Sequence, residues 1–200
     1  MSVQGSPEWY AERCGFATSS EFSSVLAKGK GLTRASYLRR VVAERLTGKP
    51  TETYKNGHME RGQEQEPYAR MSYEAITGNL VEEVGFIKHP TIMAGCSPDG
   101  IIGDDGGAEI KSVIPTVQLE TILRGRYPPE HVAQTQGSLW ITGRKWWDFC
   151  SYSPDMPEHL RTYIFRVTPD ADYIKTLEAE VIVFLGEVDA LIAKLNERTK

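Results

Sequence analysis

The spacing of the apolar residues changes along this chain, and that change constrains the fold more than any other feature. Between residues 173 and 195 apolar side chains recur every three or four positions, which is the period of one face of a helix. Between residues 80 and 167, short runs of aromatic and β-branched residues alternate with clusters of glycine, proline and aspartate, a pattern typical of strands joined by turns. We therefore expect an α/β fold in which helices pack on a central mixed sheet.

The first 79 residues are expected to be mainly helical. Ser6 followed by a proline predicts the start of a short helix that runs to about Arg13, because serine caps helices and proline suits their first turn. Further helices are expected to start at Thr18, at Thr33 and near residue 56, with a loop at residues 29–31. The helix that starts near residue 56 carries a partial apolar stripe, formed by Met59, Tyr68, Ala69, Met71, Tyr73 and Ile76.

The remaining elements complete a single predicted domain over residues 1–200. Its parts are a helical segment (1–79), a sheet core that carries the candidate site (80–167) and a long C-terminal helix (168–200). Strands are expected at residues 80–88, 91–96, 100–102, 108–113, 145–152 and 160–167. Two more helices are expected between the strands, at residues 116–123 and 128–142.

Composition excludes several classes of protein. The chain carries 23 basic and 27 acidic side chains, a net charge of −4, whereas proteins that coat nucleic acid are usually basic. An enzyme that gathers its positive charge in one groove stays compatible with this balance. The three cysteines form no CxxC pair and the four histidines have no ligand spacing, which argues against a zinc ribbon or a histidine metal site. Without a signal peptide or an apolar run of about 18 residues, a cytoplasmic protein is expected.

The segment 96–112 is the most informative about chemistry. A Pro-Asp-Gly turn at Asp99 leads into a strand, and a glycine-rich stretch then predicts a hairpin whose return strand carries Glu109. Residues two apart in a strand share a face, so Glu109 and Lys111 point the same way while Ile110 faces an apolar layer. If the hairpin pairs in register, Asp99 lies beside Glu109 and Lys111.

Two carboxylates and a lysine at one strand end suit metal-assisted phosphodiester hydrolysis. Carboxylate oxygens hold Mg²⁺, which shares phosphate oxygens and lowers the pKa of a bound water. A neighbouring lysine can orient that water or balance the charge on the phosphate. The residues alone leave a second interpretation open, a solvated surface hairpin with an ordinary Glu–Lys pair.

A resemblance to a known family favours the first interpretation. The pattern Pro98-Asp99, Glu109-x-Lys111 resembles the PD-(D/E)xK nuclease signature. Further blocks, in the same order, are similar to one branch of that superfamily, the phage lambda exonuclease or YqaJ-like viral recombinase family. These blocks are residues 9–22 (W-x3-R-x-G-x2-T-x-S), 61–66 (a helix block with a glutamate), 95–100 (C-S-P-D-G) and 133–140 (A-Q-x-Q-x-x-x-W). One departure is Arg61, where that branch often has an aromatic residue.

The resemblance implies a restriction-endonuclease-like core with a Mg²⁺ centre, two ions per site, which Mn²⁺ can replace. Asp99, Glu109 and the carbonyl of Ile110 would bind the first metal. Glu66 would serve the metal centre from a helix. Lys111 would position the attacking water, and Gln134 would help to order it.

The same resemblance implies a binding site for the 5′-terminal phosphate, formed by Arg13, Ser20 and Ser97. The chemistry of these residues is consistent with that role. A guanidinium binds phosphate oxygens through two parallel hydrogen bonds. Ser20 is expected at a helix start, where free N–H groups favour an anion.

The activity implied is that of a Mg²⁺-dependent 5′→3′ exonuclease. It would degrade one strand of linear double-stranded DNA and leave a 3′ overhang for phage-type recombination by single-strand annealing. Partners would be an annealing protein and two further copies of the chain in a toroidal homotrimer, and the origin would be a phage or prophage.

Two alternatives remain, an endonuclease with the same core and a catalytically inert DNA-binding subunit. A 5′-phosphate site at Arg13 and Ser20 has no obvious use in an enzyme that cuts internally. The complete set of Asp99, Glu109 and Lys111 argues against an inert subunit.

Overall fold

Two sheets, rather than the single sheet expected, form the centre of the molecule. The computed structural model describes residues 2–27, 32–51 and 57–197. The main sheet has the order β4-β5-β6-β7 and the smaller one the order β1-β3-β2. The strands are β1 (Ala17–Thr18), β2 (Ile87–Lys88), β3 (Ala94–Cys96), β4 (Gly100–Ile102), β5 (Gly106–Ser112), β6 (Trp146–Tyr152) and β7 (Thr162–Val167). The longer helices are α1 (Pro7–Arg13), α3 (Leu32–Thr47), α4 (Gly57–Thr77), α5 (Pro115–Arg124), α6 (Val132–Thr142) and α7 (Ala171–Glu197).

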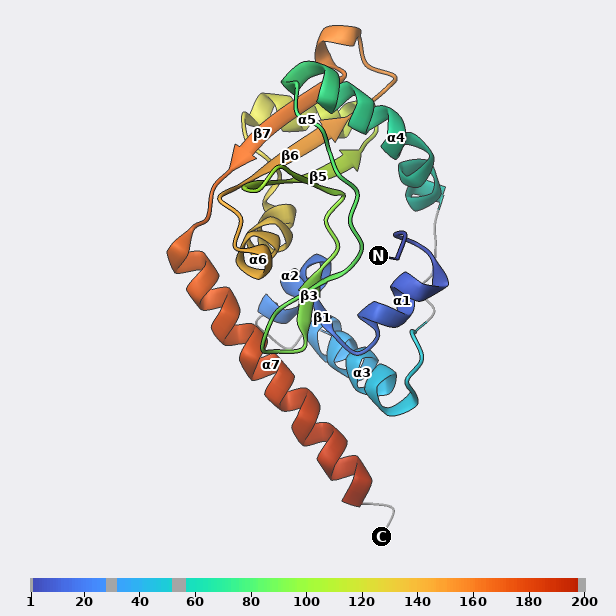
Figure 1. Cartoon of the computed structure of the whole chain (residues 1–200), viewed down its shortest axis with the longest axis vertical. Coiled ribbons are helices and arrows are strands. Elements are labelled where there is room, and N and C mark those ends of the chain that lie inside the picture. The colour runs from blue at the N-terminus through green and yellow to red at the C-terminus, as the bar shows by residue number, and fades with distance from the viewer. Residues whose placement is uncertain (1, 28–31, 52–56, 198–200) are drawn as a thin grey trace.

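The main sheet is mixed because of how its strands are connected. β4 and β5 form the predicted antiparallel hairpin, and β6 and β7 form another. β5 and β6 run parallel, since the chain crosses between them through α5 and α6. Figure 1 shows the main sheet with α4 and α5 in one half of the molecule, and the smaller sheet with α1, α2 (Phe22–Leu26) and α3 in the other.

Each face of the main sheet has its own apolar cluster. Ala69 and Tyr73 of α4 pack against Ala108 and Ile110 of β5 on one face. On the other face, Leu139 of α6 lies in a cluster with residues of β6 and β7. Period-2 alternation along β5 therefore directs Ile110 toward α4, as predicted, and Glu109 and Lys111 toward α6.

The glycines at the start of β5 allow its close approach to β6. A Cβ atom on Gly106 would lie 2.1 Å from the ring of Trp146, and one on Gly107 would lie 2.3 Å from the ring of Trp147. Only glycine leaves room for both indoles, so the glycine-rich stretch holds the strand that carries Glu109 against its neighbour.

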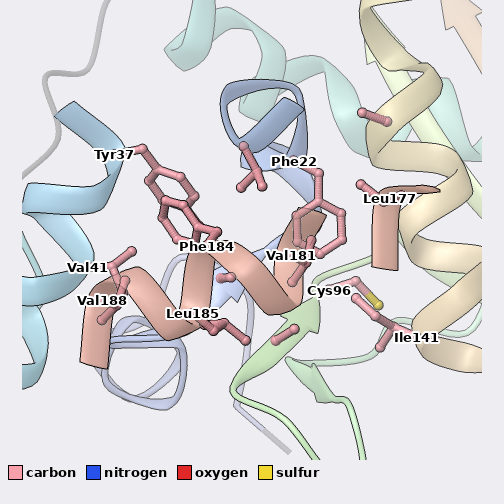
Figure 2. Packing of buried hydrophobic residues seen from close by; sticks show 14 of the residues in the cluster. Phe22, Tyr37, Val41, Cys96, Ile141, Leu177, Val181, Phe184, Leu185 and Val188 are labelled. Carbon is pink, nitrogen blue, oxygen red and sulfur yellow. The ribbon is translucent and has the colours of Figure 1, made fainter. Parts of the chain in front are cut away.

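The smaller sheet is held by the predicted C-terminal helix. Leu177, Val181, Phe184, Leu185 and Val188 of α7 are buried in one cluster, which Figure 2 shows together with Phe22, Tyr37, Val41, Cys96 and Ile141. These partners come from α2, α3, β3 and α6, so α7 ties the N-terminal helices to the sheets. Among the described residues, no helix is both long enough and apolar enough to cross a membrane.

Most predicted elements are present, with shifted ends. Ser6 caps α1, as predicted, and its hydroxyl accepts a hydrogen bond from the backbone N–H of Trp9. The predicted helix start at Thr18 is instead the end of β1, followed by a 3-10 turn, η1 (Ser19–Glu21), and then α2. Helix α3 begins at Leu32, one residue before the predicted cap, Thr33. The predicted loop at residues 29–31 lies outside the described residues.

One prediction about residues 57–88 was wrong. Most of the strand expected at 80–88 is irregular, with a single bridge at Glu82 before the two-residue β2. The apolar stripe of α4 is only partly buried, because Ala69 and Tyr73 face the sheet whereas three other members are exposed. Those three are Tyr68, Met71 and Ile76.

Candidate active site

The candidate site lies at the start of β4, beside the C-terminal half of β5. Gly100 pairs with Ala108, which places Asp99 opposite Glu109, as the hairpin register predicted. The Oδ2 atom of Asp99 accepts a hydrogen bond of 2.6 Å from the backbone N–H of Ile110. The N–H and C=O groups of one strand residue point to the same edge, so the carbonyl of Ile110 also faces Asp99.

Glu109 and Lys111 form an ion pair on the α6 side of β5, and Gln134 of α6 joins them. The Nε2 atom of Gln134 donates a hydrogen bond of 2.5 Å to Oε1 of Glu109. Glu109 is 1% exposed, which makes it one of the few buried carboxylates of the described chain. The block at residues 133–140 and the hairpin therefore meet at the carboxylate of Glu109.

Glu66 approaches the same site from α4. It lines a cavity of about 650 Å³ together with Asp99 and Arg70, which lies one helical turn after it. The opposite wall of that cavity is formed by residues 2–5 and 83–85. Arg70 also forms an ion pair with Glu83. The cavity gives solvent access to the carboxylates of Glu66 and Asp99.

The electrostatics of the site are those of crowded acids. Burial raises the pKa of Glu109 to about 7, the negative charge of Asp99 adds to that rise, and Lys111 opposes it. Burial likewise raises the pKa of Asp99 and of Glu66. Burial by itself would lower the pKa of Lys111, but the charges of Glu109 and Asp99 outweigh it and raise that pKa above its ordinary value.

These carboxylates fit a hard divalent cation. The Oε2 atom of Glu109 is buried and has no hydrogen-bond partner among the described residues, so it can still accept a ligand. A nearby cation would also relieve the repulsion that raises the carboxyl pKa values. Over residues 2–27, 32–51 and 57–197, no three Asp, Glu, His or Cys side chains form a complete metal site by themselves. Water, a backbone carbonyl or a phosphate would have to supply the remaining ligands, as is usual for Mg²⁺.

A second cavity, of about 420 Å³, is lined by Trp9, Arg13 and Ser20. Arg13 Nη2 donates to the hydroxyl of Ser20 across 3.5 Å. The Arg13 guanidinium lies 4.0 Å from the ring centroid of Trp9. The indole N–H of Trp9 donates to the Ser97 hydroxyl at 3.1 Å. Trp9 thus contacts Arg13 and Ser97, and Ser20 joins them through its contact with Arg13.

The structure therefore groups the predicted residues into two adjoining sets. One set contains Asp99, Glu109, Ile110, Lys111, Gln134 and Glu66, and the other contains Arg13, Ser20 and Ser97. The connection Ser97-Pro98-Asp99, between β3 and β4, joins the sets.

Two residues beside the site were missed by sequence reasoning. Arg70 was not singled out, although it lies four residues after Glu66 on a predicted helix. His131 packs against Phe149, with ring centroids 5.1 Å apart and the ring planes tilted by 30°. Burial and the charge of Lys111 lower its pKa to about 4. His131 lies three residues before Gln134. Helical spacing from Glu66 and from Gln134 could therefore have indicated both missed residues, Arg70 and His131.

Comparison with known proteins identifies the family of the chain. The model of the YqaJ-like viral recombinase domain matches residues 8–145. The chain is 39% identical to LHK-Exo, an alkaline exonuclease from Laribacter hongkongensis, with a TM-score of 0.90 over 97% of this chain and 98% of that one. The structure of LHK-Exo in complex with dAMP gives a TM-score of 0.91 at the same identity and coverage.

A more distant structure shares the fold alone. A phage-related exonuclease from Haemophilus somnus 129PT is 13% identical, with a TM-score of 0.69 over 90% of this chain and 96% of that one. Comparison with curated proteins found no match. The expected restriction-endonuclease-like arrangement, with sheets flanked by helices and a long C-terminal helix, is confirmed. With a family match over most of its length and a close structural relative, this chain belongs to the family of YqaJ-like viral recombinase domains.

Proposed function

We propose that this protein is a Mg²⁺-dependent exonuclease that degrades one strand of linear double-stranded DNA from its 5′ end. The observation that carries the proposal is a pair of cavities linked by the hydrogen bond from Trp9 to Ser97 and by the short connection from Ser97 to Asp99. One cavity is lined by Asp99 and Glu66 of a carboxylate–lysine centre suited to phosphodiester hydrolysis, and the other holds a guanidinium and a hydroxyl suited to a terminal phosphate. The 39% identity to an alkaline exonuclease supports the same assignment.

The residues divide the work between them. Asp99, Glu109 and the Ile110 carbonyl would hold a first Mg²⁺, and Glu66 would serve a second. When bound, the metal polarises the scissile phosphate and lowers the pKa of the attacking water. Gln134 fixes the Glu109 carboxylate through its amide N–H.

Lys111 keeps its positive charge at neutral pH because of the surrounding acids, so it can orient water or balance charge on the phosphate. Arg13, Ser20 and Ser97 would hold the 5′-phosphate one nucleotide away from the scissile phosphate. The end product would be a 3′ single-stranded overhang, used in phage-type recombination by an annealing protein in the host cytoplasm. We also propose a homotrimeric ring, which would keep the enzyme on its DNA.

The test is digestion of the same DNA as a linear duplex with 5′-phosphate ends, a linear duplex with 5′-hydroxyl ends and a closed circle, each with Mg²⁺ or with EDTA. We expect only the linear forms to disappear, only with metal, and the phosphorylated one faster. Label at the 5′ end should be released first. Cutting of the circle would favour the endonuclease alternative, and no digestion with Mg²⁺ or Mn²⁺ would favour an inert subunit.

A matched pair of lysine variants tests the residue assignment. Lys111→Ala is expected to abolish digestion while the circular-dichroism spectrum is unchanged. Lys145→Ala removes an exposed lysine that pairs with Asp105 at the tip of the same hairpin, and is expected to digest normally. Normal digestion by Lys111→Ala would refute the assignment.

A further inference from the structure

The cavity that contains Arg13 holds a second guanidinium, that of Arg40. Arg40 belongs to α3 and lines the same cavity of about 420 Å³ as Arg13 and Ser20. Its guanidinium lies 4.8 Å from the ring centroid of Tyr37, a buried residue whose hydroxyl accepts the backbone N–H of Thr18 at 2.9 Å. Packing on Tyr37 fixes the side chain of Arg40 against the wall that carries Ser20.

The charges around this cavity leave room for an anion. Arg40 has one carboxylate partner among the described residues, Glu21, at 2.6 Å, and a guanidinium has five N–H donors. The other carboxylate that lines the cavity, Glu44, accepts the backbone N–H groups of Gly15 and Thr51. Within the described chain Arg13 has no ion-pair partner at all, and its only polar side-chain contact is with Ser20.

The two arginines line one cavity, so a single anion can contact both guanidinium groups. Burial lowers the pKa of Arg13, and the positive charge of Arg40 lowers it further. Two cations facing one half-buried cavity lose this repulsion when an anion binds between them. The arrangement therefore favours an anion with more than one negative charge.

Terminal and internal phosphates differ in just this property. A phosphate monoester carries about −1.5 to −2 charges at neutral pH, whereas a backbone phosphodiester carries one. One arginine can balance a diester, but a monoester calls for a second cation. We propose that Arg40 is the specificity-determining residue that, with Arg13, makes the cavity select a terminal 5′-phosphate over a 5′-hydroxyl end or an internal phosphate. This inference rests on the proposed function and adds a residue that the family resemblance did not assign.

The experiment measures the ratio of digestion rates on 5′-phosphorylated and 5′-hydroxyl linear duplexes for the wild type, Arg40→Met and Arg39→Gln. Arg39 is the matched control, because it is the neighbouring arginine of α3, is exposed, and contacts the Ser36 hydroxyl at 3.4 Å. Arg40→Met keeps a stem that can pack on Tyr37 and removes the charge. We expect its ratio to fall about tenfold or more, the value of one charge-assisted hydrogen bond. We expect the ratio for Arg39→Gln to match the wild type.

The outcomes separate this inference from the proposed function. If the wild type digests both ends equally well, the 5′-phosphate site itself is refuted, and the role of Arg40 with it. If the wild type prefers the phosphate and Arg40→Met prefers it as strongly, only the role of Arg40 is overturned. An equal loss in Arg39→Gln would also overturn it, since general attraction to DNA would then explain the effect.

Binding provides a readout that does not depend on turnover. Fluorescence anisotropy with phosphorylated and unphosphorylated duplexes in EDTA should give the same loss of preference for Arg40→Met. Thermal unfolding checks that the variant is folded, and Arg40→Gln serves as the second neutral variant if methionine is not tolerated. An unchanged binding preference in a folded neutral variant would overturn the inference.

Discussion

Replacement of Glu109 by glutamine removes a buried charge at the centre of the candidate site, and we expect the metal-free protein to become more stable at alkaline pH. Glu109 is 1% exposed, and burial raises its pKa from 4.5 to about 7. Each tenfold change in proton affinity corresponds to about 1.4 kcal/mol, so ionising this carboxyl in the folded protein costs about 3 kcal/mol. Glutamine has the same shape and can still accept the amide N–H of Gln134.

The direction of the pH effect follows from the raised pKa. The folded protein holds the proton of Glu109 more tightly than the unfolded chain does, so this group contributes stability that is fully present below about pH 4.5. That contribution is lost as the pH rises through about 7. Lys111 loses a partner in the variant. Because its pKa is raised above the ordinary value, Lys111 stays protonated over this pH range, and the effect of that loss on stability does not change with pH.

The assay is urea unfolding in EDTA at several pH values between about 5 and 8, with the wild type and Glu109→Gln compared at each. The difference in free energy of unfolding, variant minus wild type, should rise by about 3 kcal/mol between the lowest and the highest pH. Addition of Mg²⁺ at pH 8 should then stabilise the wild type and not the variant. A difference that is constant with pH would refute the reasoning, because Glu109 would then titrate equally in both states.

Two further predictions concern packing around the site. Gln118→Leu should lower the free energy of unfolding, measured in urea, by about 2–4 kcal/mol. The fully buried Gln118 amide donates to the carbonyls of Ser151, Leu160 and Arg161, and leucine would leave them unpaired. A loss under about 0.5 kcal/mol would contradict this. Gly137→Ala should lower the melting temperature by several degrees, since a Cβ atom there would lie 2.4 Å from Phe22, whereas Gly186→Ala on α7, which meets no atom within 4 Å, should leave it unchanged or raise it; equal shifts in both would refute the packing argument.

Local signals explain what could be predicted from the sequence. The hairpin around Asp99 and Glu109 was predictable because turn residues and period-2 alternation act over a few positions. The long helix α7 was predictable because its apolar period holds for more than 20 residues.

The failures concern partners that lie far away in sequence. β1 has only two residues, and its partner Ala94 lies on β3, which α2, α3 and α4 separate from β1 along the chain. On α4, period alone did not decide which face would be buried, and the sheet selected Ala69 and Tyr73 over Tyr68 and Met71. The contact of Trp9 with Ser97 and the cavity shared by Arg13 and Arg40 depend on the same long-range packing.

The connection between the two sheets has a consequence for the size of the product. Ser97 accepts a hydrogen bond from Trp9, which lines the cavity with Arg13, and Asp99 belongs to the carboxylate centre, with only Pro98 between Ser97 and Asp99. Two residues of extended chain span at most about 7 Å, and proline fixes one of the backbone angles. The backbone thus fixes the distance between the point where a DNA end would be held and the point where it would be cut. On the proposed function, this fixed distance sets the length of the released fragment, which is then independent of the base that the fragment carries.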